Sequence, residues 1–121
     1  MLQGFEDYTE SLNEHELKLI PLFVAGFKNK IGKGQAITNK EIVEALGKKD
    51  IHLSETKIRK IINYIRNKSI VPGLVASSQG YYITKDPVEL KKYIESLDGR
   101  VNEIMRVKES MKKYLFQLSQ Q

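Results

Sequence analysis

The chain has 121 residues, of which 40% are hydrophobic and 29% charged, and it carries a net charge of +5 with no cysteine. This length fits one globular domain with an appendage, and no apolar run approaches the roughly 18 residues that a membrane span needs. The acidic N-terminus is unlike a signal peptide, and the lack of cysteine excludes disulfides and thiolate metal sites. We therefore expect a cytoplasmic protein without a membrane partner.

The positive charge is concentrated in the middle of the chain. Residues 28–72 carry eleven Lys and Arg against four acids, whereas residues 1–27 carry one against five and residues 73–121 carry eight against six. Clustered basic charge favours a polyanionic partner, and nucleic acid is the commonest such partner.

The first predicted helix has an explicit start. Asn13 can cap it, and Glu16 stands three residues on to close a capping box. Its apolar stripe runs through Leu17, Ile20, Phe23, Val24 and Phe27, and Gly32–Gly34 ends it. Pro21 is a misfit, because a proline within a helix removes a hydrogen bond. The sequence therefore predicts a kink near Leu17 or a helix that begins close to Pro21.

Two further capped helices follow a short apolar segment, Ala36–Ile37, which is long enough for a stub of strand. Thr38 and Glu41 form a capping box for the first helix, and Gly47 is its expected stop. Ser54 caps the second helix, which extends to Lys68. Two short helices joined by a tight turn predict a helix-turn-helix.

The helix over residues 54–68 has two contrasting faces. At 100° per residue its inner arc is apolar and carries Ile58, Ile61, Ile62 and Ile65. The opposite arc carries Thr56, Lys60, Asn63 and Asn67, with Arg59 and Tyr64 at its margins, and no carboxylate. A helix that only needed solubility would more often include Glu to pair with Lys. The pattern predicts a helix that lies against an anionic partner.

A β-hairpin is predicted after this helix. The segments 73–77 and 81–84 are rich in β-forming residues, and Gly80 between them can supply the positive φ of a short loop. Tyr81 and Tyr82 alternate across the second strand, so we expect one to pack in the core and the other to be free.

The C-terminal segment predicts a long helix. Asp86 caps it and Pro87 takes its first position. Apolar residues then recur three and four apart over about four heptads, at Ile94, Leu97, Val101, Ile104, Met111, Leu115 and Leu118. Gly99 is the weak point, and the alternative is two helices with a bend there. The spacing is typical of a coiled-coil dimer interface, although a helix packed on its own domain can show the same spacing.

This order of elements is that of the winged helix-turn-helix, in which the hairpin is the wing. The stretches 36–42 (AITNKEI), 58–66 (IRKIINYIR) and 80–83 (GYYI) resemble small winged-helix proteins of phage and prophage genomes, mostly of unassigned function. The resemblance covers about residues 12–115 and implies this fold and DNA binding. We expect an α+β, mainly α protein with an N-terminal tail (1–11), a winged-helix domain (12–85) and a C-terminal helical dimerisation extension (86–121).

Duplex DNA binding assigns roles to individual side chains. For base reading in the major groove we expect Lys60 and Asn63 first, then Thr56 and Asn67, because Asn suits adenine and Lys suits guanine. The expected phosphate contacts are Lys40, Ser54, Lys57, Arg59, Tyr64, Arg66 and Lys68. The wing would contribute Ser78, Gln79, Gly80 and Tyr81, but its tip has no Lys or Arg. The competing interpretation is that a Lys-rich helix face is only solvated.

Catalysis finds little support in the sequence. Gly26 and Gly32-Lys33-Gly34 are one residue too far apart for a phosphate loop, and no catalytic triad or metal motif occurs. We expect no enzyme activity, no cofactor and no metal. The leading hypothesis is a transcriptional regulator that binds duplex DNA as a homodimer. The alternative is a protein-interaction module that recruits a protein partner through the C-terminal helix, and RNA binding ranks last.

Overall fold

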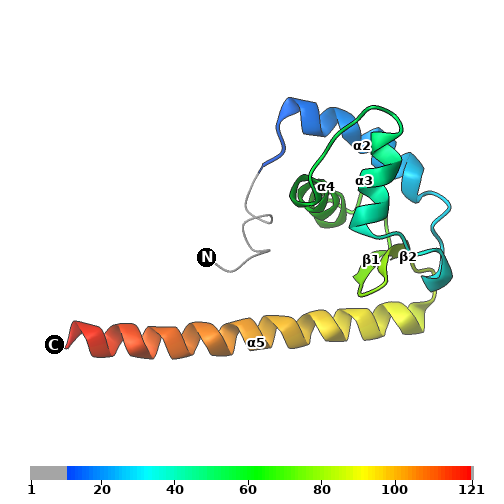
Figure 1. The fold of residues 1–121 in the computed structure, drawn as a ribbon. Helices are drawn as coiled ribbons and strands as arrows, with labels where there is room; N and C mark the ends of the chain where they lie inside the picture. Colours follow the sequence, from blue (N-terminus) through cyan, green and yellow to red (C-terminus); the bar gives the residue numbers. More distant parts are fainter. Residues whose placement is uncertain (1–10, 121) are drawn as a thin grey trace. The chain divides into compact units, whose positions relative to one another are not determined.

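A computed structural model describes residues 11–120, which belong to two units divided between Lys85 and Asp86. The first unit contains the helices α2 (Glu14–Phe27), α3 (Asn39–Gly47) and α4 (Glu55–Asn67), a short 3-10 helix η1 (Lys33–Gln35), and the strands β1 (Leu74–Ser77) and β2 (Gly80–Ile83) (Figure 1). The second unit is the single helix α5 (Pro87–Ser119). These residues form an α+β, mainly α structure. The predicted N-terminal tail lies outside the described residues, apart from Ser11.

The core of the first unit is built around α4. The four isoleucines of its predicted inner arc are all 0% exposed, so that prediction is confirmed. They belong to one hydrophobic cluster with residues from α2, α3 and the hairpin, among them Phe23, Phe27, Ile42, Leu46, Leu74 and Ile83. Burial of four β-branched side chains on one stripe fixes the rotation of α4 about its own axis.

Helix α2 begins where its capping box predicts. The Asn13 side chain accepts a hydrogen bond from the Glu16 N–H, and the Glu16 carboxylate accepts one from the Asn13 N–H. These bonds satisfy two of the free donors at the N-terminus, and the helix starts seven residues before Pro21 and continues through it. The alternative of a start close to Pro21 is wrong. The helix ends at Phe27, before the predicted stop at Gly32–Gly34.

Helices α3 and α4 are each followed by a left-handed residue that is not glycine. Asp50 has φ 61° and Ser69 has φ 54°. The Ile51 N–H donates to the Leu46 carbonyl at 2.9 Å, and the Ile70 N–H donates to the Ile65 carbonyl at 3.0 Å. This is the Schellman pattern, in which a left-handed residue lets the chain bond back over the last turn. Helix α3 thus ends at Gly47, as predicted, and the left-handed residue of the pattern is Asp50.

The hairpin has a further backbone partner beside β2. Strand β1 pairs antiparallel with β2, from Leu74 opposite Ile83 to Ser77 opposite Gly80, which leaves a two-residue loop. Ile37 forms an antiparallel bridge to Tyr81 on the other edge of β2, as expected for a stub of strand. Gly80 has φ 119°, and a Cβ there would lie 2.4 Å from the Ile37 carbonyl oxygen. Only glycine allows the chain to turn and approach Ile37 so closely.

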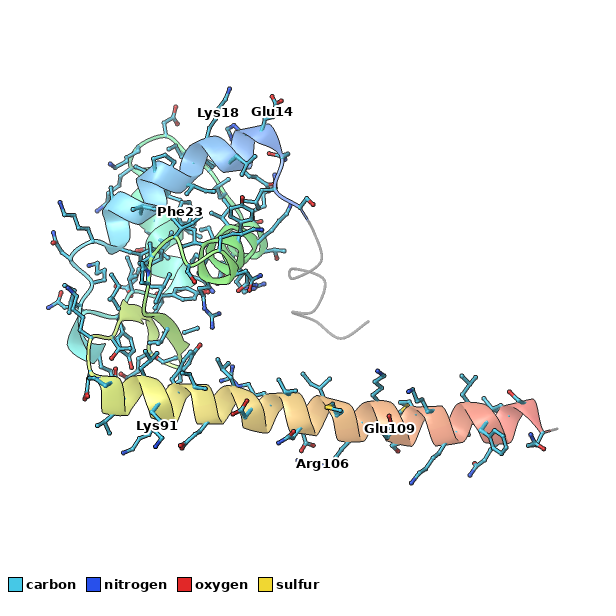
Figure 2. All side chains as sticks on the ribbon, turned by 180° about the vertical axis from the view of Figure 1, so that it is seen from behind. Glu14, Lys18, Phe23, Lys91, Arg106 and Glu109 are labelled. Atoms are coloured by element: carbon cyan, nitrogen blue, oxygen red, sulfur yellow. The ribbon has the colours of Figure 1, made fainter. Side chains whose placement is uncertain are left out.

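The second unit is one unbroken helix. It spans 33 residues, runs through Gly99 and so excludes the predicted alternative of two helices with a bend, and none of its residues is buried. Asp86 caps it by accepting a hydrogen bond from the Val88 N–H. Figure 2 shows its side chains, Lys91, Arg106 and Glu109 among them, standing off the helix. Within residues 11–120, no helix has the length and apolar character that a membrane crossing requires.

The glycine at the start of β2 gives a direct test of this fold. Gly80→Ala should lower the free energy of unfolding by at least about 2 kcal/mol, because a non-glycine residue is strained at this φ and its Cβ would clash with Ile37. The control is Gly26→Ala, since Gly26 lies in α2 with open space around the new Cβ. That change should be neutral or stabilising by up to about 1 kcal/mol. Urea denaturation measures both, and equal effects would contradict the hairpin geometry.

Candidate nucleic-acid interface

The surface of α4 opposite the core carries most of the predicted site residues. Ser54, the residue that caps α4, is exposed, as are Thr56, Lys57, Asn67 and Lys68, whereas Arg59, Asn63, Tyr64 and Arg66 are partly buried. A helix of 13 residues is about 20 Å long, so these side chains share one compact surface. We call this surface the α4 face. It carries four basic side chains and two amides, which are the groups that bind phosphate oxygens and base edges.

Lys60 does not belong to the accessible part of the α4 face. Its Nζ donates a hydrogen bond to Glu16 Oε1 at 3.0 Å, and its side chain is only 15% exposed. The prediction that Lys60 is available to read a base is therefore wrong. The helical wheel places it opposite the isoleucines, but the first turn of α2 supplies a buried carboxylate at that position.

Glu16 joins two elements with one carboxylate. Glu16 is 3% exposed, and its Oε1 accepts hydrogen bonds from both the Asn13 N–H and Lys60 Nζ. Burial raises the pKa of this carboxyl, but the hydrogen bonds from Asn13 and Lys60 and the charges of Lys60 and Lys57 outweigh burial and lower the pKa below its ordinary value. Glu16 is thus charged at neutral pH, and it holds α2 against α4.

Two local contacts restrain side chains of the α4 face. Arg59 Nη2 donates to Thr56 Oγ1 at 3.3 Å, one turn earlier on the helix. Lys68 Nζ lies 6.0 Å from the centroid of the Tyr64 ring, within the range of a cation–π interaction. These contacts hold both charges near the surface of α4, where a phosphate could reach them.

The N-termini of α3 and α4 are already occupied by their own capping groups. The Ser54 hydroxyl already accepts from the Lys57 N–H, and the Thr38 hydroxyl accepts from the Glu41 N–H. The Thr38 N–H and hydroxyl both donate to the Glu41 carboxylate and lower its pKa, so Glu41 remains negative. A fixed carboxylate at the start of α3 repels a phosphate, although the exposed Lys40 side chain beside it can still reach one.

The hairpin contributes polar but uncharged groups. Ser78 and Gln79 form its exposed tip, and Gly80 is partly buried against Ile37. Tyr81 is 8% exposed and its ring packs edge-on against Phe27, with 6.2 Å between the centroids. Tyr82 is 6% exposed, so the expectation that one of the two tyrosines is free is wrong. Successive residues of a strand point to opposite faces, so both faces of β2 are covered at this place.

A shallow hollow brings distant segments together beside the hairpin. It is lined by the start of α3, by Glu55 of α4 and by both strands near the tip. Asn39, at its edge, has a side-chain oxygen that is buried and has no hydrogen-bond partner among the described residues. Such an acceptor is unusual and suggests a missing donor. The burial of this oxygen could not be predicted from the sequence, because it depends on the hairpin lying beside the start of α3.

The residues predicted to form a dimer interface all lie on α5. Six of them are between 39% and 64% exposed, and Leu97 is partly buried.

In the part of the chain that the structure describes, no group of three or more His, Cys, Asp or Glu side chains could hold a metal ion. Comparisons of the chain with protein-family models, with curated proteins and with solved structures gave no match.

The pair between Glu16 and Lys60 should control the acid stability of the first unit. Glu16→Gln should lower the free energy of unfolding at pH 7 by roughly 1–3 kcal/mol, because it leaves the Lys60 ammonium largely buried without its counter-charge. Since the pKa of Glu16 is lowered by folding, its stabilisation is complete above the ordinary value of 4.5 and is lost as the pH falls through the lowered pKa. Urea titrations of both proteins at pH 7 and pH 3 should therefore converge at the lower pH.

The control for this prediction is the double variant Glu16→Gln with Lys60→Met. It removes the unpaired ammonium but keeps an apolar stem in its place, so it should regain part of the lost free energy at pH 7. If the double variant loses as much as the sum of the two single variants, the ion pair is not the source of the stability.

Proposed function

We propose that residues 12–85 form a winged helix-turn-helix domain that binds duplex DNA through the α4 face. The order of the elements supports this fold: a helix, a bridge residue, two helices joined by the connection 48–54, and a hairpin that pairs with the bridge residue. In such a domain the second helix of the pair enters the major groove. That helix is α4.

The observation that carries the proposal is the composition of the α4 face. Four isoleucines on the opposite side are fully buried, and Thr56, Lys57, Asn67 and Lys68 of this face are exposed. It presents Lys57, Arg59, Arg66 and Lys68 around two amides, Asn63 and Asn67. The carboxylate of Glu55 lies only in the first turn of the helix. Positive charge flanking amide groups matches a duplex, in which phosphates flank the base edges.

We propose that the protein is a transcriptional regulator that acts as a homodimer. The uncharged hairpin tip gives the wing no strong attraction for phosphate, so α4 supplies most of the contacts. Apolar side chains exposed along α5 support self-association, because surfaces of this kind are commonly covered by a partner. We also propose a mobile genetic element as the setting, because the segments 36–42, 58–66 and 80–83 resemble small winged-helix proteins of phage and prophage genomes.

One observation favours a second candidate function. Phe116 is 66% exposed, and it stands outside the heptad positions of α5. Met105 and Val107 are also exposed beside those positions. A helix with apolar groups on more than one side can recruit a second protein, so the chain could act as an interaction module. The two functions differ in whether the first unit binds a duplex at all.

Binding should depend steeply on salt if α4 meets phosphates. With five or six phosphate contacts, affinity for a labelled duplex should fall roughly a thousandfold between about 50 and 200 mM salt. Lys57→Ala combined with Lys68→Ala removes two exposed charges from the α4 face. The slope of log affinity against log salt should then become shallower by about 1.8. Fluorescence anisotropy measures both quantities.

The matched control for this titration is Lys48→Ala with Lys49→Ala. These lysines are also exposed, and they follow the C-terminal end of α3, away from the hairpin. The pair removes the same charge from the same unit and should leave the slope nearly unchanged. If the wild type does not bind a duplex even at low salt, DNA binding is refuted and the interaction module remains.

Sequence preference should depend on the two amides of the α4 face. After selection of a preferred duplex from a random pool, Asn63→Ala and Asn67→Ala should each lose about 5- to 150-fold of the discrimination at one base pair, because a bidentate amide contact is worth about 1–3 kcal/mol. Binding to an unrelated duplex should change little. Equal losses on both duplexes would show that the amides position the protein and do not read bases.

A further inference from the structure

We propose that α5 pairs with α5 of a second copy of this chain in the antiparallel direction, with the two-fold axis near Arg106. This inference rests on the homodimer of the proposed function and specifies the direction and register of its two α5 helices. The heptad side chains of α5 are exposed along a helix that has no buried residue. A second copy is the occupant that fits, because the flanking charges complement one another in only one direction.

Parallel pairing meets a charge problem in its core. The heptad that runs from Ile94 to Leu118 is apolar at every core position except Lys108. In a parallel pair each core residue faces its own copy, so two Lys108 ammonium groups would face each other. The flanking positions bring no compensation, because no pair across the two helices joins opposite charges. The residues that would meet are Tyr93 with Asp98, Arg100 with Met105, Val107 with Lys112 and Tyr114 with Ser119.

Antiparallel pairing removes this repulsion. Core residues at equal distances from Arg106 then share a layer, and the layers are Ile94 with Leu118, Leu97 with Leu115, Val101 with Met111 and Ile104 with Lys108. The flanking residues meet the same heptad position of the other chain, which is offset from this rule by two residues. Each Lys108 packs its aliphatic stem on an isoleucine, and its ammonium can reach solvent at the edge. The apolar residues beside the core also find a place, because Met105 meets Met105 and Val107 meets Val107 next to the axis.

The flanking charges fix the register as well as the direction. In the antiparallel pair Asp98 of one chain faces Lys112 of the other, and the two-fold axis repeats this contact. Lys112 Nζ lies 3.6 Å from Glu109 Oε1 in its own helix, so Lys112 would lie between two carboxylates. A shift by one heptad in either direction separates Asp98 from Lys112. One of these shifts also places Lys91 against Lys112.

The direction of pairing decides where the DNA-binding units are attached. Pro87 lies 19 residues before Arg106, so the first residues of the two paired helices are about 57 Å apart. Parallel helices would begin side by side. Adjacent half-sites on DNA are about 34 Å apart. An antiparallel dimer is therefore suited to well-separated half-sites or to two DNA segments.

The absence of cysteine allows a direct test with the full-length chain. Met105→Cys should form a disulfide-linked dimer under mild oxidation, because the two copies of residue 105 meet near the axis. Leu115→Cys should not, because its two copies would be separated by 18 residues of helix rise, about 27 Å. Crosslinking at 105 should be on the order of a hundredfold faster than at 115, since only a held pair has a high effective concentration. Parallel pairing predicts the reverse.

A charge reversal checks the register independently. Asp98→Lys should weaken dimerisation by about tenfold in sedimentation experiments, and Asp98→Lys with Lys112→Asp should restore it. Crosslinking of Leu115→Cys in preference to Met105→Cys would overturn the antiparallel arrangement and leave the homodimer intact. A monomeric mass at micromolar concentration would overturn both. Duplex binding is measured separately, so its failure would not be confused with either result.

Discussion

The burial of one isoleucine stripe on α4 is the constraint on which the rest of the first unit depends. Four branched side chains at 0% exposure leave this helix no freedom to rotate, and α2, α3 and the hairpin all pack against the same stripe. The opposite side of α4 is thereby turned outward as a consequence of packing. The chemistry of the candidate interface is thus set by the residues that the core does not use.

The pair between Glu16 and Lys60 shows how the same helix is held on another side. Glu16 closes the capping box of α2 and binds the ammonium of Lys60 with the same oxygen. A charge that could have met DNA instead joins two helices of the fold. This places the proposed contacts on the remaining groups of the α4 face, and it makes Asn63 and Asn67 the central candidates for reading bases.

The two units contribute different parts of the proposed function. The first unit carries a basic, amide-bearing surface next to an uncharged hairpin, and the second carries a long helix with an exposed heptad. Lys108 interrupts the apolar core of that heptad, so two paired helices must keep their Lys108 ammonium groups apart. The proposed antiparallel pairing separates these groups, and it would set the distance between two bound DNA segments.

The sequence alone determined the elements whose signals are local. The capping boxes at Asn13 and Thr38, the buried arc of α4, and the positive φ of Gly80 all follow from neighbours a few residues apart. The tertiary structure decided what depends on distant contacts: the burial of Tyr81 and Tyr82 on the two faces of β2, and the capture of Lys60 by a carboxylate 44 positions away. A helical wheel shows where a side chain points but not what folds over it, and so only the folded chain could separate Lys60 from the accessible α4 face.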